Sequence, residues 1–357
     1  MAELTTRERM ARIYEHREAD RAPVWDRPWG STLARWRREG LPAGADYMEF
    51  LGLDRIREMG VDASPRYPVR TLEETDEYVT QVSSYGATMR NWKHSGGVPE
   101  FLDFTITSPE AWTAAKKRMT PDRDRIDWAW LAGEYPKWRA EGAWVRARMR
   151  FGFDLTHSFA VGTERVLMAL AAEPEWMTDM FNTELDMGIA LYEQVWDAGY
   201  RFDELYWCDD MGYKLHQFFS LDMYRELLKP VHRRAVEWAH SKGIKAHLHS
   251  CGDIRPFVPE LAGLGLDMLN PLEVKAGMDP AALKQEFGDL LAFNGGLNAV
   301  LFERPEELWA EMRRVVPAMK AGGGYLIGSD HSVPESVSLE TFKEFARLAR
   351  ELGRYER

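Results

Sequence analysis

Residues 244–253, IKAHLHSCGD, carry the pattern that decides the fold of this chain. A short apolar run leads into polar residues, which is typical of a buried strand that ends at an exposed edge. Side chains at positions i and i+2 of a strand point the same way. His249 and Cys251 therefore share one face, while Ala246 and Leu248 share the other. We predict a strand that packs its apolar face against helices and turns an imidazole and a thiol toward one point.

The same unit recurs along the chain. Short apolar runs alternate with longer amphipathic stretches, and such repetition is typical of a parallel sheet with right-handed crossovers. The predicted strands are 144–151, 204–208, 244–250, 267–271, 291–294 and 325–328, with a first strand at 21–25 and a further one within 61–82. Eight strands fit a (β/α)8 TIM barrel. An open doubly wound sheet is the alternative, and it is disfavoured because no glycine-rich phosphate loop follows an early strand.

The segments between these strands predict helices and one insertion. Thr163, Ser220 and Ser338 are placed as N-caps, because their side-chain oxygens can accept an otherwise unpaired backbone N–H. A further helix is predicted over 305–320. Residues 88–140 are polar, tryptophan-rich and irregular. We interpret them as a helical insertion near the N-terminal third that covers the barrel mouth.

Length and composition limit the class of protein. A chain of 357 residues with 45% hydrophobic content can bury a large core, and we expect one barrel domain over residues 1–357. The formal net charge of −11 argues against a nucleic-acid partner. Two cysteines cannot form a disulfide framework, and no signal peptide or membrane-spanning stretch is recognisable. We expect a cytoplasmic protein that binds neither nucleic acid nor a membrane.

Polar residues gather at the predicted C-terminal ends of the strands, where barrels of this kind build their active sites. The successive ends carry Asp26-Arg27, then Arg146, Arg148 and Arg150 at alternate positions, then Cys208 to Lys214, His249 to Asp253, Asn270 to Glu273, Asn294 to Asn298, and Gly328 to His331. Each group alone also fits a structural interpretation, such as aspartates that cap a loop. Seven polar strand ends in succession predict an active site at this edge.

The histidine and the cysteine are candidate metal ligands. Imidazole nitrogen and thiolate sulfur are ligand types that zinc prefers, and a tetrahedral site needs more than two of them. His331 and Asp330, on the last predicted strand end, are the candidates for a further ligand. The motif His249-x-Cys251 alone also fits a buried cysteine beside a hydrogen-bonded histidine.

Several segments together resemble the uroporphyrinogen decarboxylase superfamily, whose fold is a single (β/α)8 barrel. The resemblance covers about residues 20–350 and rests on ADRAPVWDR, WCDDMGYK, HLHSCGD, FNGGLNAV and GSDHSVPESVSLE. The true decarboxylases of this superfamily need no cofactor and carry an arginine-rich RQAGR signature. This chain has Asp26-Arg27-Pro28-Trp29-Gly30 at that place, which speaks against decarboxylation of the acidic tetrapyrrole.

The motifs are more similar to those of the corrinoid-dependent branch, which holds the methylcobamide:coenzyme M methyltransferases. Enzymes of that branch bind zinc through His-x-Cys and a distant third cysteine. His249 and Cys251 match the first two positions, whereas Asp330 and His331 stand where the third cysteine is expected. The resemblance therefore implies a zinc-dependent methyltransferase that moves a methyl group between a small substrate and the corrinoid (cobalamin) of a partner protein.

Under this hypothesis the other polar strand ends have supporting roles. The expected catalytic residues are Asp209, Asp210, Tyr213 and Glu273, and the expected substrate-binding residues are Trp25, Arg27, Trp29, Arg148, Lys214 and Asn294. Two alternatives remain open. One is a cofactor-independent decarboxylase or lyase that binds a carboxylate substrate through the arginine face. The other is a non-catalytic protein that binds a corrinoid or tetrapyrrole.

Overall fold

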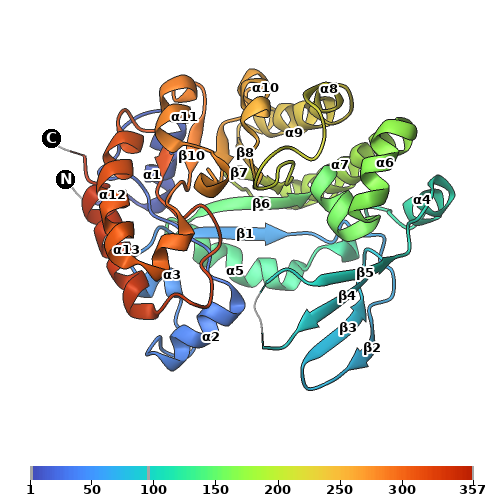
Figure 1. The fold of residues 1–357 in the computed structure, drawn as a ribbon, viewed down its shortest axis with the longest axis horizontal. Helices are drawn as coiled ribbons and strands as arrows, with labels where there is room; N and C mark the ends of the chain where they lie inside the picture. The colour runs from blue at the N-terminus through green and yellow to red at the C-terminus, as the bar shows by residue number, and fades with distance from the viewer. Residues whose placement is uncertain (1–2, 95–96, 356–357) are drawn as a thin grey trace.

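A curled sheet of parallel strands forms the centre of the molecule in the computed structural model, which describes residues 3–94 and 97–355 (Figure 1). Its strand order is β1-β6-β7-β8-β9-β10-β11, and all neighbouring strands are parallel. The strands are β1 (Ile56–Gly60), β6 (Trp144–Arg150), β7 (Glu204–Cys208), β8 (Lys245–His249), β9 (Met268–Asn270), β10 (Ala292–Asn294) and β11 (Tyr325–Leu326). The predicted α/β class and parallel sheet are confirmed.

The predicted first strand is present as a short bridge. Val24 pairs in parallel with Ile327, and the backbone N–H of Trp25 donates to the Ile327 carbonyl at 3.0 Å. On its other side, the Asp54 N–H donates to the Val24 carbonyl at 2.8 Å. The segment thus stands between β11 and the chain that enters β1, which is the place of the missing strand of a (β/α)8 barrel.

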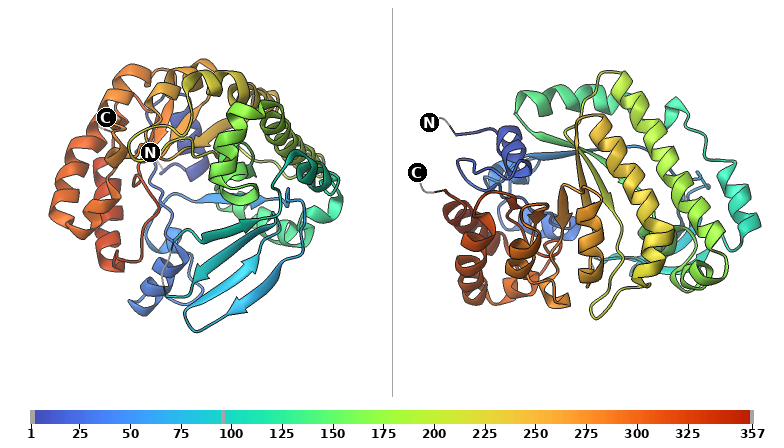
Figure 2. Two further views of the ribbon diagram at one scale, coloured as in Figure 1. Left: turned by 45° about the vertical axis from the view of Figure 1, so that its right-hand side comes forward. Right: turned by 90° about the horizontal axis from the view of Figure 1, so that it is seen from above.

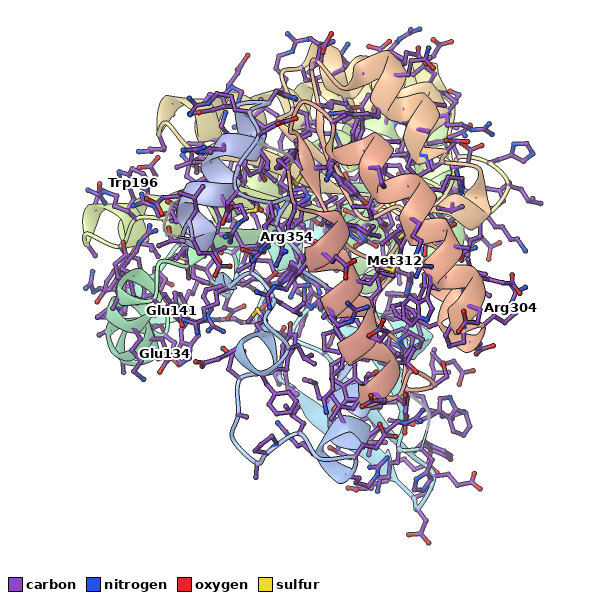
Figure 3. All side chains as sticks on the ribbon, turned by 90° about the vertical axis from the view of Figure 1, so that its left-hand side faces the viewer. Glu134, Glu141, Trp196, Arg304, Met312 and Arg354 are labelled. Carbon is purple, nitrogen blue, oxygen red and sulfur yellow. The ribbon has the colours of Figure 1, made fainter. Side chains whose placement is uncertain are left out.

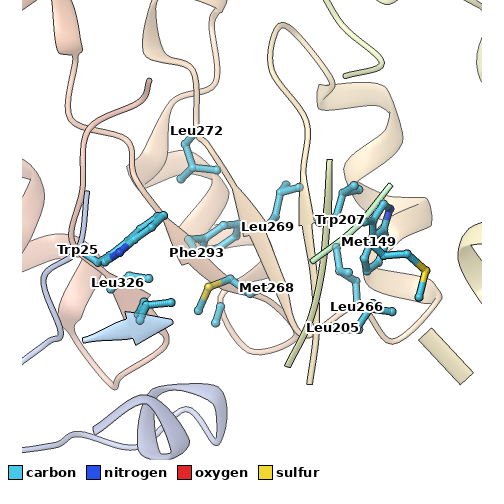
Figure 4. Close-up of a cluster of buried hydrophobic side chains, with 14 of the residues drawn as sticks. Trp25, Met149, Leu205, Trp207, Leu266, Met268, Leu269, Leu272, Phe293 and Leu326 are labelled. Carbon is cyan, nitrogen blue, oxygen red and sulfur yellow. The ribbon is translucent and has the colours of Figure 1, made fainter. Parts of the chain in front are cut away.

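Alternation along the strands separates an apolar outer face from a polar inner face. Leu205 and Trp207 of β7, Leu269 of β9 and Phe293 of β10 are fully buried in the apolar cluster shown in Figure 4. Burial of one such side chain contributes about 1.5–3 kcal/mol, and a one-residue slip would exchange the two faces. The outer face therefore fixes which side chains reach the interior, among them Tyr206, His247, His249, Asn270 and Asn294.

Helices surround the parallel sheet (Figure 2). They are α1 (Thr6–Tyr14), α2 (Gly30–Arg38), α3 (Tyr47–Phe50), α6 (Thr163–Ala172), α7 (Pro174–Asp197), α8 (Leu221–Met223), α9 (Lys229–Ser241), α10 (Val258–Gly263), α11 (Pro280–Phe287), α12 (Pro305–Lys320) and α13 (Leu339–Leu352). Two π-helical turns occupy Leu155–Ala160 and Tyr224–Leu228, and short 3-10 turns occupy Arg123–Arg125, Arg255–Phe257, Val274–Ala276 and Ala299–Glu303. No helix of the described residues combines the length and the apolar character that crossing a bilayer requires.

Most predicted helix starts are confirmed. The Ser220 and Ser338 side chains accept the N–H groups of Met223 and Thr341. The helix predicted over 305–320 is α12, which packs beside α13 with Met312 fully buried (Figure 3). At α6 the N-cap position belongs to Gly162, not to Thr163.

The prediction of a helical insertion is wrong for its first part. β2 (Arg70–Glu74), β3 (Tyr78–Val82), β4 (Ala87–Trp92) and β5 (Glu100–Phe104) form an antiparallel sheet that lies to one side of the parallel sheet (Figure 2). Cross-strand pairs such as Tyr78 with Trp92 stabilise it. Among the described residues of the predicted insertion, the α-helices are α4 (Pro109–Lys116) and α5 (Trp128–Ala140).

The parallel strand expected within 61–82 is also corrected. That strand is β1, which ends at Gly60, and the strands inside the predicted range, β2 and β3, belong to the antiparallel sheet. β1 has no apolar run that would mark it as a buried strand. Its charged residues can lie in the sheet because they form ion pairs: Arg57 pairs with Glu141, and Glu58 lies near three arginines.

Candidate metal centre and cavity

Three potential ligand atoms meet where β7 and β8 end. Asp210, His249 and Cys251 each offer one such atom, and these atoms all lie within 4.8 Å of one another. The Cys251 Sγ is 3.3 Å from the His249 Nε2, and that nitrogen is 3.6 Å from the Asp210 Oδ1. A sulfur, a nitrogen and a carboxylate oxygen at this spacing form a donor set that zinc accepts.

Strand register explains why Asp210 joins the pair. Cys208 of β7 lies opposite His249 of β8, so Asp210, two residues farther on, comes beside Cys251. The Cys251 N–H donates to the Asp210 Oδ1 at 2.7 Å and ties the two strand ends together. The sequence predicted a catalytic role for Asp210 but not a place in the ligand group, because the register between β7 and β8 cannot be inferred from a single sequence.

A hydrogen bond outside the ligand set orients the imidazole. The His249 Nδ1 lies 2.6 Å from the Asn270 Oδ1 of β9. With the proton on Nδ1 for this bond, the Nε2 lone pair faces Cys251 and Asp210. Metal-binding histidines are commonly held in this way.

Burial controls the protonation of the ligand candidates. It lowers the pKa of His249, which keeps the imidazole neutral and able to bind a metal. Burial, followed by the nearby Asp210 and Glu273 carboxylates, raises the pKa of the Cys251 thiol well above its usual value. A cation among these groups would offset the repulsion that disfavours the thiolate.

The two predicted candidates for the further ligand are separated from this group. Asp330 is fully buried, and its two carboxylate oxygens accept the N–H groups of Val274 (3.0 Å) and Ala299 (2.8 Å). It organises two loops and does not line the cavity described below. His331 does line the cavity, with its ring edge-on to Trp29 at 6.0 Å between centroids. The ligand group found among the described residues does not include it.

A cavity of about 1060 Å³ opens over the ligand group. The start of α2, the tip between β4 and β5, and the strand ends supply its walls. Its lining residues are Arg27, Pro28, Trp29, Gly30, Ser31, Ala34, Arg38, Trp92, Lys93, His94, Gly97, Val98, Asp210, His249, Cys251, His331, Ser332 and Glu335. Of the predicted substrate-binding residues, Arg27 and Trp29 lie here.

A smaller cavity of about 50 Å³ adjoins it, and we call it the inner cavity. It shares Arg27, His249, His331 and Ser332 with the outer one, and it is further lined by Trp25, Asp26, Tyr206, Asn270, Pro271, Asn294 and Ser329. The predicted residues Trp25 and Asn294 therefore lie at the site, but in this inner part.

Asp209 lies outside both cavities. It is fully buried, and burial raises its pKa. Its Oδ2 is 2.8 Å from the His232 Nε2, and its Oδ1 accepts the Asp154 N–H at 2.6 Å. One oxygen therefore joins the loops after β6 and β7, and the other joins this strand end to α9, so Asp209 is held away from the cavity.

The remaining predicted residues also lie outside the cavity walls. The Glu273 Oε2 accepts the Gly252 N–H at 2.7 Å and so supports the loop that carries Cys251. Tyr213 and Lys214 are exposed on the loop after β7. Arg148 lies 3.8 Å from the Glu58 carboxylate, inside the sheet.

Arg146 and Arg148, two of the three arginines on the predicted face, lie in the sheet interior. Arg146 is fully buried between the rings of Trp25 and Tyr206, with its guanidinium carbon 4.8 and 4.4 Å from their centroids. Its Nε lies 3.0 Å from the Glu204 Oε1, although the pair is not aligned as a hydrogen bond. Sequence alternation predicted their common face, but not their acidic partners on neighbouring strands.

The sequence did not predict a role for Asp154, whose carboxyl group lies near the site. Asp154 follows β6, and burial, then Asp210 and Asp209, raise its pKa to about 8. It lies four residues beyond the end of β6, directly before the π-helical turn, and the sequence pattern of the strand end did not include it.

Comparisons with known proteins agree on the fold. A family model described as Uroporphyrinogen decarboxylase (URO-D) matches residues 155–352, more than half of the chain. A methyltransferase from Methanosarcina mazei matches with a TM-score of 0.68 and 14% identity, covering 98% of this chain and 99% of that one. At this identity the likeness shows the fold alone.

Two further solved structures have TM-scores too low to support an argument. One is a D-psicose 3-epimerase in the presence of D-fructose, with a TM-score of 0.31 and 14% identity over 62% of this chain and 81% of that one. The other is a sugar phosphate isomerase/epimerase from Parabacteroides distasonis, with a TM-score of 0.37 and 11% identity over 94% and 96%. A search of curated proteins found no match.

Proposed function

The chain belongs to the uroporphyrinogen decarboxylase family, and on this premise we propose that it is a zinc-dependent methyltransferase. It would move a methyl group between a small substrate and a corrinoid carried by a partner protein. The observation that supports this most strongly is the meeting of Asp210, His249 and Cys251 within 4.8 Å beneath an open cavity.

The surroundings of these residues fit zinc. Asn270 orients the His249 ring, and the Cys251 N–H holds Asp210 in place. Three protein ligands leave a fourth position for a substrate atom, as in catalytic rather than structural zinc sites. We therefore assign the third ligand to Asp210 and give His331 a place in the cavity wall.

Zinc bound there would supply a Lewis acid for the heteroatom that carries or receives the methyl group. A carboxylate donates less electron density to zinc than a thiolate does. With Asp210 in place of a third thiolate, the zinc ion would therefore be a stronger Lewis acid. Trp29 and His331 would hold the substrate against one wall, and Arg27 would place a positive charge beside it. Asp209 and Glu273 would act indirectly, by holding the loops on which Asp210 and Cys251 lie.

The outer cavity offers room for two reactants. Its volume of about 1060 Å³ exceeds what a zinc-bound small molecule requires. A corrinoid presented by a docked partner protein could therefore approach the zinc-bound atom from the open side. The alternative decarboxylase finds less support, because Arg146 and Arg148 pair with Glu204 and Glu58 rather than facing the cavity.

Metal content and methyl transfer test the proposal together. The protein, produced without a His tag, is measured for zinc by elemental mass spectrometry beside Cys251→Ser, Asp210→Asn and His331→Ala. We expect about one zinc per chain in the parent and in His331→Ala, and strong loss in the other two. Transfer of the methyl group from free methylcobalamin to an added small thiol, which loses its proton as the thioether forms and leaves cob(I)alamin, is followed by corrinoid absorbance and should be lost in the same two variants. A parent without zinc after reconstitution would refute the mechanism.

A further inference from the structure

The carboxylate of Asp210 lies just beyond the end of a strand. β7 ends at Cys208, and one further backbone bond, from the Asp209 N–H to the His249 carbonyl at 2.8 Å, extends the pairing by a single residue. The Asp210 side chain is 34% exposed and receives a hydrogen bond from the Cys251 N–H, which belongs to another loop. Its direction therefore also depends on how its neighbour Asp209 is anchored.

A chain of three buried side chains leads from α9 to Asp209. The His232 Nε2 lies 2.8 Å from the Asp209 Oδ2, and the His232 Nδ1 lies 3.2 Å from the Tyr224 hydroxyl. His232 belongs to α9, and Tyr224 belongs to the π-helical turn before it. All three side chains are fully buried. With the proton on Nε2, the ring donates to Asp209 and accepts from Tyr224, so both ring nitrogens are paired.

Close packing limits the movement of His232 and Asp209. The His232 ring stands edge-on to the rings of Phe151 and Trp207, with 6.2 and 5.7 Å between centroids. Trp207 itself belongs to the apolar cluster of Figure 4. At Gly152 a Cβ would lie 2.5 Å from the Asp209 Oδ2, so the backbone there also closes in on the carboxylate. Loss of the imidazole would thus leave a buried carboxylate oxygen short of a donor, which is costly.

The two neighbouring aspartates serve opposite sides of the chain. The Asp209 carboxylate faces α9, which packs against β8, whereas Asp210 lines the outer cavity. Because the two residues share a peptide unit, anchoring the first carboxylate on the helix side restricts rotation of the second. A released Asp209 would let this unit turn, and Asp210 would then move away from His249 and Cys251.

We propose that His232 is a positioning residue for the metal site. It holds the Asp209 carboxylate on the helix side and thereby keeps the Asp210 carboxylate turned toward His249 and Cys251. The inference rests on the proposed function, since it assumes that a metal binds these last three side chains. It adds a residue of α9, outside the walls of both cavities, on which metal affinity depends.

Cobalt(II) in place of zinc tests the proposal, because the visible absorption of bound cobalt depends on the number and arrangement of its ligands. The full chain, produced without a His tag, is compared with His232→Gln and His232→Asn, and chelator competition gives the affinity for each metal. Glutamine can place an amide N–H where the imidazole Nε2 lies, beside Asp209. Asparagine is one methylene shorter, so its amide reaches the place of Nδ1, beside Tyr224, but not Asp209.

The two variants should therefore differ. Changes just outside a ligand set lower metal affinity about 10- to 100-fold. His232 acts through one more residue, so we expect about a tenfold loss in His232→Asn, with a changed cobalt spectrum. His232→Gln should keep the parental affinity and spectrum. Tyr224→Phe removes a single oxygen atom and frees the far side of the ring, so it should lower the affinity in the same direction by less.

Val236→Ala is the matched control. Val236 is buried on α9, one turn beyond His232, and it is apolar. This variant should unfold at a lower urea concentration than the parent but keep the parental affinity and spectrum. Urea unfolding of every variant confirms that it is folded when its affinity is measured.

The outcomes separate this inference from the proposed function. Parental affinity in His232→Asn, or in Tyr224→Phe should His232→Asn not fold, would overturn the positioning role. Equal losses in Val236→Ala, or no recovery in His232→Gln, would do the same, because the effect would then come from lost packing. A parent that binds neither cobalt nor zinc would overturn the proposed function and this inference with it.

Discussion

Gly252 keeps the two loops that carry the proposed metal ligands in contact. Its φ of +83° is a left-handed conformation that side chains with a Cβ disfavour. A Cβ at this position would lie 2.5 Å from the Gly212 carbonyl oxygen, and it would also press on Gly212 C and Tyr213 N. These are backbone atoms of the loop after Asp210, so no side-chain rotation relieves the clash.

The size of the effect of Gly252→Ala follows from this geometry. Real Cβ contacts stay beyond 3.0 Å, so the loops must separate by at least 3.0 − 2.5 = 0.5 Å. Metal–ligand distances tolerate about 0.2 Å, and the separation pulls Cys251 away from Asp210. We expect zinc affinity to fall about 10- to 100-fold, as for changes just outside a ligand set. The backbone conformation and the overpacking should cost about 2–5 kcal/mol of stability.

Gly243→Ala is the matched control. Gly243 has a φ of +69°, but a Cβ there would meet nothing within 4 Å. It should lose about 1–2 kcal/mol of unfolding free energy from the backbone alone and retain parental zinc affinity. Chelator competition gives the affinity, and urea unfolding gives the stability. Parental zinc affinity in Gly252→Ala would refute the reasoning, as would equal losses in both variants.

Three further predictions concern buried polar groups. Asn270→Ala should weaken zinc binding about 10- to 100-fold by freeing the His249 ring, and chelator competition that shows no change would contradict this. Because the pKa of Cys251 is raised and that of His249 is lowered, zinc should displace one thiol proton. Its affinity should then rise about tenfold per pH unit, and calorimetry in buffers of different ionisation enthalpy would count the proton. Burial alone would raise the pKa of Glu204, but Arg146 and His247 lower it to about 2 from 4.5, so its ionisation contributes about 3 kcal/mol at neutral pH. This stability is fully present above pH 4.5 and is lost as the pH falls toward 2, and the deficit of Glu204→Gln in urea unfolding should shrink over the same interval.

The sequence predicted the features that repeat locally. Alternating apolar residues located β6 to β11, and serine caps located the starts of α8 and α13. The shared face of His249 and Cys251 followed from their spacing alone. These features depend on a few neighbouring residues, so local patterns suffice to predict them.

Features that depend on distant segments were missed. Asp210 reaches the metal-ligand candidates because β7 and β8 pair in one register, and Asp330 is occupied by the N–H groups of Val274 and Ala299. The strand β1 was hidden because its charged residues pair across strands instead of facing solvent. Three-dimensional partners, which a single sequence does not reveal, decided each of these outcomes.

The walls of the outer cavity come from two different sheets. The proposed ligands lie at the ends of β7 and β8, whereas Trp92, Lys93, Gly97 and Val98 come from the tip of the antiparallel sheet. Exchange of that tip would reshape the wall and leave the ligand positions on their strands. Such a division lets new substrate preferences evolve by loop replacement, and it makes the tip between β4 and β5 the natural place to graft a different specificity.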